Sequence, residues 1–206
     1  MIEIKNLEFF YNSKNPIFKN LNYKFYDGRF YVISGANGVG KTTLIKLILG
    51  LLAPINGFIN NTNNIIGYLP DYNGIYENLT VLENIKFRIG IYNKSYVRLK
   101  NTIEDLLNKY NIYKYKNCLV KNLSFGTQKK LALICAYIIN PDLLILDEPT
   151  SGLDNNSKKE LIEMLVSYNN QDNKNYIVLC ISHDQMLIDE INANTLLLKN
   201  GELFDE

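Results

Sequence analysis

The sequence contains no long apolar run. Its longest apolar stretches are LIKLILGLLA, which includes Lys46, and LALICAYII. Both are well short of the ~20 residues that a helix needs to cross a membrane. The amino-terminal stretch MIEIKNLEFF alternates like a strand and lacks the apolar core of a cleavable signal peptide. We therefore expect a cytoplasmic chain that reaches a membrane only where another protein holds it.

The sequence also has few cysteines, a single histidine and a net charge close to zero. Cys118, Cys135 and Cys180 are far apart and lack the spacing of a metal site, and dispersed thiols fit a reducing cytosol. His183 is the only histidine, and a lone histidine is more often structural than catalytic. A formal net charge of +1 argues against a molecule whose whole surface binds nucleic acid, so no nucleic-acid partner is expected.

The charges are nevertheless unevenly distributed. Between Lys86 and Lys130 the chain has eleven Lys or Arg residues and two acidic residues, Glu104 and Asp105. Such a basic lobe suits an anionic membrane surface or an acidic partner. An ordinary solvated helical surface explains it equally well, and composition leaves both readings open.

The order of apolar runs and turn residues predicts alternating strands and helices. Strands are expected over residues 1–10, 17–26, 31–34, 143–147 and 176–182, and helices over 41–52, 80–110, 126–139, 157–168 and 185–191. Asn56-Gly57 predicts a hairpin between two short strands, the second ending in IIGYLP, and residues 195–203 predict a terminal hairpin. Continuous apolar strands between helices favour a parallel sheet covered on both faces.

Residues 35–42 (GANGVGKT) match the phosphate-loop pattern G-x-x-x-x-G-K-[ST] and lie between an expected strand and an expected helix. Glycines let successive backbone N–H groups point at phosphate, and the helix start adds its positive dipole end. Lys41 can reach the β- and γ-phosphates, Thr42 can ligate Mg²⁺, and Thr43 can add a phosphate contact. The predicted ATP-binding residues here are Gly35, Asn37, Gly38, Gly40, Lys41, Thr42 and Thr43. A flexible turn that binds nothing is the alternative.

The run LLILDE supplies two acids at the end of a buried strand. Asp147 can hold Mg²⁺ through water, and Glu148 can polarise a water that attacks the γ-phosphate. An apolar strand that ends in a solvated acidic turn is the alternative. The phosphate loop elsewhere in the chain favours the catalytic reading.

Three further strings narrow the class. LSFGTQ at 123–128, DEPTSGLD at 147–154 and ISHD at 181–184 occur in this order after the phosphate loop. With these motifs the chain resembles the nucleotide-binding domain of ABC transporters over essentially its whole length. The resemblance implies an α/β P-loop NTPase core with a mostly parallel sheet, an N-terminal antiparallel β subdomain and an inserted α-helical subdomain. It implies one domain over residues 1–206, with the helical part at about 77–138.

The resemblance also implies that two such domains pair head to tail around two ATP molecules. The signature residues Ser124, Gly126 and Gln128 would then face an ATP bound by the partner, and Asp154 would couple the two sites. His183 matches the histidine that contacts the γ-phosphate, and Tyr11 matches the aromatic residue that stacks on adenine. Taken alone, Ser124 could be an ordinary helix cap. Tyr11 could equally be strand packing.

Two positions depart from the family pattern. Asp71 stands where a Gln is usual, and it could meet Mg²⁺ through water together with Thr42 and Asp147. Phe125 stands at the first glycine of the signature and adds bulk near the partner's nucleotide.

Residues 66–91 resemble the corresponding stretch of drug- and peptide-exporter ATPases, where a groove receives the membrane subunit. Candidates for its walls are Tyr72, Tyr76, Leu79 and Phe87. The expected partners are a separate transmembrane permease and a second ABC ATPase subunit, identical or different, on the inner face of the cell membrane. The chain ends soon after Gly201, so we expect no C-terminal regulatory domain. The alternatives are a soluble ABC ATPase, such as an iron–sulfur assembly factor, and a non-hydrolysing regulatory subunit.

Overall fold

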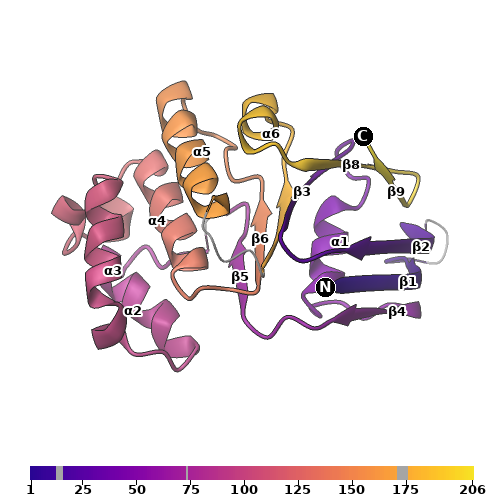
Figure 1. Cartoon of the computed structure of the whole chain (residues 1–206), viewed down its shortest axis with the longest axis horizontal. Helices are drawn as coiled ribbons and strands as arrows, with labels where there is room; N and C mark the ends of the chain where they lie inside the picture. The colour runs from indigo at the N-terminus through magenta and orange to yellow at the C-terminus, as the bar shows by residue number, and fades with distance from the viewer. Residues whose placement is uncertain (13–15, 73, 171–175) are drawn as a thin grey trace.

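The computed structural model describes residues 1–12, 16–72, 74–170 and 176–206. Its centre is a six-stranded sheet with the order β5-β6-β7-β3-β8-β9 (Figure 1). These strands are β5 (Ile66–Leu69), β6 (Leu143–Asp147), β7 (Ile177–Ile181), β3 (Arg29–Ser34), β8 (Asn194–Lys199) and β9 (Glu202–Asp205). All neighbouring pairs are parallel except β8 and β9. The predicted parallel sheet and terminal hairpin are therefore confirmed.

Both faces of the central sheet are buried. Along β6, Leu144 and Leu146 pack into one apolar core, whereas Leu143 and Ile145 pack into a second core on the opposite face. Side chains alternate between the two faces of a strand, so a fully apolar run suits a strand covered on both sides. The first core holds α4 (Phe125–Tyr137) and α5 (Asn155–Asn169), and the second holds α1 (Lys41–Ile48).

A second sheet of three antiparallel strands packs beside α1 (Figure 1). Its order is β2-β1-β4, formed by β1 (Ile2–Phe9), β2 (Phe18–Phe25) and β4 (Asn56–Asn61). The hairpin predicted at Asn56-Gly57 is wrong, because β4 pairs with β1 while β5 pairs with β6 in the other sheet. Gly57 has a φ of 75° and lies opposite the Lys5–Glu8 irregularity of β1. Its turn-like backbone therefore serves a bulge within the sheet rather than a hairpin.

Helix α1 is shorter than predicted. It ends at Ile48 rather than at residue 52, with Leu49 as its C-cap. Gly50 follows with a φ of 70°, the left-handed conformation in which helices commonly end. The glycine, rather than Pro54, therefore ends this helix.

A group of helices lies between β5 and β6 in the sequence and at the far end of the molecule from the antiparallel sheet (Figure 1). It comprises α2 (Val81–Ile91), α3 (Tyr96–Lys109), two short 3₁₀ turns (Tyr113–Tyr115 and Val120–Asn122) and α4. Thr80 and Glu83 form a capping box at the start of α2. Helix α6 (Gln185–Ile191) follows β7. Within the described ranges, no helix is long and apolar enough to cross a membrane.

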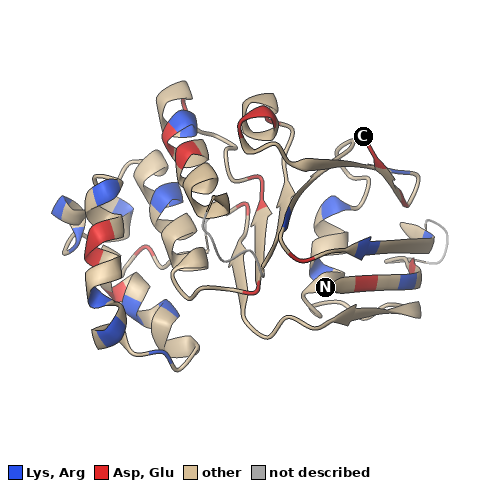
Figure 2. Cartoon of the chain, viewed as in Figure 1, with Lys and Arg blue, Asp and Glu red and all other residues tan. Residues whose placement is uncertain are grey.

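The basic residues gather on this helical group, where Lys and Arg occur along α2 and α3 (Figure 2). Several lysines lie over tyrosine rings of the same group, for example Lys86 at 4.9 Å from the centroid of Tyr96 and Lys116 at 4.0 Å from that of Tyr113. Part of the basic lobe is therefore engaged in contacts within the chain.

The close approach of β1 and β4 at Gly57 predicts that Gly57→Ala destabilises the protein, and Gly50→Ala provides a matched control. A Cβ at Gly57 would lie 2.2 Å from the backbone oxygen of Asn6, whereas one at Gly50 would meet nothing within 4 Å. Both glycines have similar positive φ values, so Gly50→Ala isolates the backbone strain of about 1 kcal/mol. Gly57→Ala should lower the free energy of unfolding in urea by at least about 2 kcal/mol more than Gly50→Ala. Equal losses would show that β1 and β4 do not approach this closely.

Candidate active site

The loop between β3 and α1 has a backbone suited to an anion. Gly35 and Gly40 have φ values of 139° and 115°, and a Cβ at either would lie 2.5 Å from a neighbouring atom, the Leu198 oxygen or the Ile17 Cγ2. In the described structure no side chain caps α1. The first N–H groups of α1 therefore remain available to a ligand, and the helix dipole favours a negative charge there.

Lys41 opens α1 and is buried, with 8% of its surface exposed. Its ammonium donates to the backbone oxygens of Gly35 at 2.6 Å and Ala36 at 3.2 Å. Two backbone carbonyls of the phosphate loop thus hold the Lys41 ammonium in place. A phosphate oxygen is a stronger acceptor for an ammonium than a carbonyl, because bonds between charged groups are stronger.

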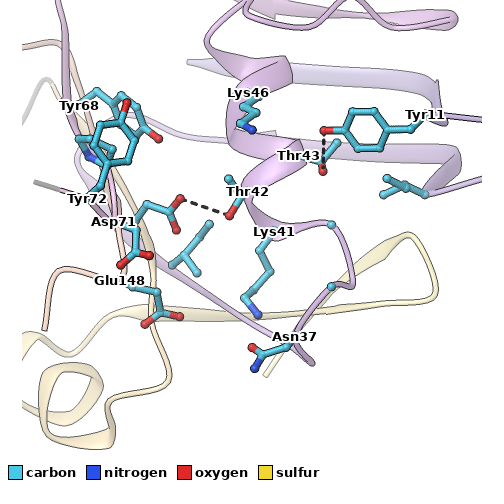
Figure 3. Close-up of a pocket in the computed structure, with 16 residues that line it drawn as sticks. Tyr11, Asn37, Lys41, Thr42, Thr43, Lys46, Tyr68, Asp71, Tyr72 and Glu148 are labelled. Carbon is cyan, nitrogen blue, oxygen red and sulfur yellow. Dashed lines mark hydrogen bonds between the residues drawn. The ribbon is translucent and has the colours of Figure 1, made fainter. Parts of the chain in front are cut away.

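A cavity of about 600 Å³ opens over this loop (Figure 3). In Figure 3, Lys41 and Thr42 lie on one side, with Asp71 and Glu148 opposite them. The cavity is lined by Tyr11, Ile17, Asn37, Gly38, Gly40, Lys41, Thr42, Thr43, Lys46, Tyr68, Pro70, Asp71, Tyr72, Asp147, Glu148 and Ile181. The sequence analysis named the loop residues, Tyr11 and the acids as site residues. It did not assign Ile17, Lys46, Tyr68, Pro70 or Ile181 to this site, and it placed Tyr72 in the groove for the membrane subunit.

The two acids at the end of β6 face this cavity. Asp147 is buried and accepts a hydrogen bond from the Thr42 hydroxyl at 3.2 Å, which joins β6 to α1. Burial raises the pKa of Asp147, and the bond from Thr42 opposes the increase. Burial also raises the pKa of Glu148, with His183 and Lys41 acting in the opposite direction. Glu148 is therefore a stronger proton acceptor than an exposed glutamate.

The backbone of Glu148 is strained. Its φ of 49° lies in the left-handed region, which costs a non-glycine residue about 1–3 kcal/mol. Its N–H donates to Ile181 at 3.0 Å, and its carbonyl accepts from the N–H of Ser151 at 3.2 Å. The Glu148 carboxylate lies 3.8 Å from Nε2 of His183, which follows β7 and is about half exposed. The chain thus brings these two predicted residues together.

A lysine that the sequence analysis did not single out also touches these loops. Lys129 of α4 is fully buried and donates to the backbone oxygens of Asp71 at 2.9 Å and Glu148 at 3.4 Å. Burial lowers the pKa of Lys129, while the charges of nearby carboxylates oppose the decrease. Residues 131–137 of α4 are all buried, so the helix has no apolar periodicity that could distinguish this lysine from a solvated one.

Tyr11 lies at the other end of the cavity, next to Thr43. Its hydroxyl is 3.5 Å from the Thr43 Oγ1, and its ring stands edge-on to Phe9 at 5.1 Å between centroids. The side chain is 63% exposed, so a planar ligand can reach the ring.

The signature residues do not line the cavity within one chain. Ser124 caps α4 by accepting from the N–H of Thr127 at 3.3 Å. The Gln128 amide donates to the backbone oxygens of Val120 and Leu123, each at 3.1 Å. Asp154 caps α5 by accepting from the N–H of Ser157 at 2.9 Å. Gly126 lies close to α5, since a Cβ there would be 2.5 Å from the Ser157 Oγ.

No group of three or more His, Cys, Asp or Glu side chains able to hold a metal ion occurs in the described residues. The predicted magnesium set is the Thr42 hydroxyl and the carboxylates of Asp147 and Asp71, which all line the cavity. Mg²⁺ is commonly held by one or two carboxylates together with substrate phosphates, and the chemistry of these three oxygen groups fits that pattern.

The phosphate loop, the acids at the strand ends and the parallel sheet together define a P-loop nucleotide-binding protein. A family model described as ABC transporter matches residues 18–151. An uncharacterized ABC transporter ATP-binding protein of Methanocaldococcus jannaschii is 30% identical over 98% of this chain and 75% of its own length. A zinc import ATP-binding protein of Buchnera aphidicola is 31% identical over 97% of this chain and 81% of its own length.

Other similarities extend the comparison. A retinal-specific phospholipid-transporting ATPase of Mus musculus is 27% identical over 98% of this chain, which spans 9% of that protein. Two solved structures, each 24% identical, share the fold with TM-scores of 0.87 and 0.83. The first, an ATP-binding subunit of an ABC transporter, is matched over 100% of this chain and 89% of its own. The second, a dimeric ATP-binding cassette in a post-hydrolysis state with ADP and Pi, is matched over 100% and 98%.

The chain belongs to the family of ABC transporter ATP-binding proteins. It is an ATP-binding and ATP-hydrolysing subunit of a transporter, as the sequence predicted. The transport proteins among its relatives do not favour the alternative of a soluble ATPase outside transport.

The exposed ring of Tyr11 leads to a binding prediction. Tyr11→Ala should weaken ADP binding roughly tenfold, because stacking of a base on an aromatic ring contributes about 1–2 kcal/mol. Tyr11→Phe keeps the ring and removes only the contact with Thr43, so its affinity should stay within about twofold of wild type. Calorimetric titration with ADP compares the three proteins. Wild-type affinity in Tyr11→Ala would mean that this residue does not stack on the base.

Proposed function

We propose that two ABC subunits, at least one of them this chain, close around Mg-ATP and hydrolyse it with Glu148 as the base, driving a separate transmembrane permease. The observation that carries the proposal is the meeting of four strand ends at one edge of the sheet. Lys41 and Thr42 follow β3, Asp71 follows β5 and Glu148 follows β6, and all four line the cavity. His183 follows β7 and lies 3.8 Å from Glu148.

In this proposal the nucleotide lies along the cavity, with adenine on Tyr11 and the phosphates on the loop. The backbone N–H groups from Gly38 to Thr43 and the ammonium of Lys41 would bind the phosphates, with Asn37 and Gly35 shaping the loop. The uncapped start of α1 and the buried ammonium support this arrangement.

Magnesium fits the residues beside the phosphates. The Thr42 hydroxyl and the Asp147 carboxylate already lie 3.2 Å apart, and Asp71 lines the same cavity. These oxygen groups are the kind that Mg²⁺ prefers, with Asp147 and Asp71 acting through water. When bound, the ion would neutralise charge on the phosphates.

Glu148 would accept a proton from the attacking water, and His183 would orient that water and contact the γ-phosphate. The raised pKa of Glu148 and its distance of 3.8 Å from His183 support these roles. The chain carries Lys41, Asp147, Glu148 and His183, the residues that a hydrolysing rather than a regulatory subunit would need in this proposal.

The partner subunit would complete the site. Ser124 and Gly126 lie at the amino end of α4, outside the cavity of their own chain, where a helix start can meet the γ-phosphate of a facing subunit. Gln128 would hold this signature segment through its bonds to Val120 and Leu123, and Asp154 would couple the two sites. An identical cassette and a different one would both serve as the partner, because the proposal requires only a second signature.

The permease would contact the inserted helical part, proposed as residues 77–138 of the single domain 1–206. Tyr72, Tyr76 and Phe87 are exposed by 83%, 54% and 44%, and the rings of Tyr76 and Phe87 are 4.9 Å apart. With the half-buried Leu79, they would form an apolar groove for a membrane subunit. The chain would then lie on the inner face of the cell membrane. Export, expected from residues 66–91, stays a prediction, because one relative is a zinc import protein.

Two substitutions separate binding from chemistry. Lys41→Ala should weaken ATP binding at least about tenfold, since a charged hydrogen bond contributes about 1.5–3 kcal/mol. Glu148→Gln should lower kcat by about 10²–10⁴-fold, leave ATP affinity nearly unchanged and accumulate an ATP-bound dimer. Equilibrium binding, steady-state turnover and light scattering with size exclusion provide the three measurements.

Lys5→Ala and Glu163→Gln are matched controls, because both residues are exposed and lie outside the cavity. They should behave like the wild type in all three assays. Normal turnover in Glu148→Gln would remove Glu148 from the mechanism and overturn the proposal.

A further inference from the structure

The fully buried Lys129 joins three segments around the proposed site. It projects from the amino end of α4, with 0% of its surface exposed. Its ammonium donates to the carbonyl of Asp71, after β5, and to the carbonyl of Glu148, after β6. A buried charge is costly unless its hydrogen bonds are satisfied, so this position strongly favours keeping both carbonyls in place.

Lys129 is hydrogen-bonded to the residue of the site whose backbone is strained. Glu148 has a positive φ, and its carbonyl has two donors, the N–H of Ser151 and the ammonium of Lys129. Strained backbone persists only where its surroundings fix it. Lys129 itself does not line the cavity, so its effect on a bound nucleotide would pass through the residues that it holds.

Lys129 also contacts the signature segment. Its ammonium lies 5.9 Å from the centroid of the Phe125 ring. Phe125 directly follows Ser124 and packs against Gly152, where a Cβ would lie 3.0 Å from the Phe125 Cε1. A displacement at the start of α4 would therefore reach Lys129, and through it the carbonyls of Glu148 and Asp71.

We infer that Lys129 is a positioning residue that fixes the Glu148 and Asp71 backbones relative to the signature helix α4. Through this bridge, two events are coupled. When the signature segment contacts a nucleotide bound by the partner subunit, the position of the Glu148 carboxylate in the same chain changes with it. The inference rests on the proposed role of Glu148. It assigns Lys129 no contact with ATP.

The test compares three variants at Lys129 with one at its neighbour. Lys129→Met removes the charge at similar length, Lys129→Gln keeps a polar amide, and Lys129→Arg restores a cationic donor. Lys130→Met is the matched control, because the ammonium of Lys130 pairs instead with Glu160 of α5 at 2.8 Å. Steady-state ATP turnover gives kcat and KM, and circular dichroism with ADP binding establishes that each variant is folded.

The Met and Gln variants should lose roughly tenfold to a hundredfold in kcat, because small displacements of reacting groups have effects of this size. Their KM for ATP should change by less than about threefold, since the interactions with bound nucleotide remain. Lys129→Arg should recover most of the lost kcat. Lys130→Met should stay within about twofold of wild type.

Wild-type kcat in either neutral variant, once folded, would overturn the inference, and so would a loss confined to KM. Failure of Lys129→Arg to recover activity while Lys129→Gln remains active would also contradict it. Glu148→Gln is measured in the same assay. If Glu148→Gln turns over ATP normally, the proposed function fails. If Glu148→Gln is inactive but Lys129→Met has wild-type kcat, only the inference about Lys129 fails.

Discussion

The parallel pairing of β5, β6, β7 and β3 is the constraint on which the rest of the structure depends. It brings the carboxyl ends of four neighbouring strands to one edge, where the amino end of α1 also lies. The hydrogen bond from Thr42 to Asp147 is the direct link between these parts. Without parallel pairing, the phosphate loop and the acids would lie at opposite edges, and neither their shared cavity nor the approach of His183 to Glu148 could form. The apolar cores on both faces of the sheet fix this edge.

One chain supplies only part of the proposed mechanism. The cavity holds the phosphate loop and the carboxylates, whereas Ser124 and Asp154 cap helices outside it. The capped starts of α4 and α5 lie close together, with Gly126 against Ser157. Such a surface suits a second subunit better than the chain's own nucleotide. The same α4 carries Lys129, so the segment that would meet the partner is also the one bonded to the Glu148 backbone. Pairing and hydrolysis would thereby be mechanically connected.

Much of this arrangement could be predicted from sequence, because the informative features are local. The phosphate loop, the acids Asp147 and Glu148, and His183 each lie at or just after the end of a strand with a clear apolar pattern, and parallel pairing then places them together. Asn56-Gly57 misled the prediction, because a positive φ serves a bulge as readily as a turn. Gly50 ended α1 earlier than Pro54 suggested. Lys129 and Tyr68 were missed because their roles depend on contacts between distant segments, which periodicity does not encode.

The most direct test of the account is to tag this chain in its own cells, extract the membranes in mild detergent and identify what copurifies in the presence of ATP. The account predicts an integral membrane protein in stoichiometric amount, retained by the wild type and lost when the exposed Tyr76 and Phe87 are both replaced by Ser. Recovery of the chain alone, or with soluble proteins only, would contradict the proposal that its ATP site drives a membrane permease.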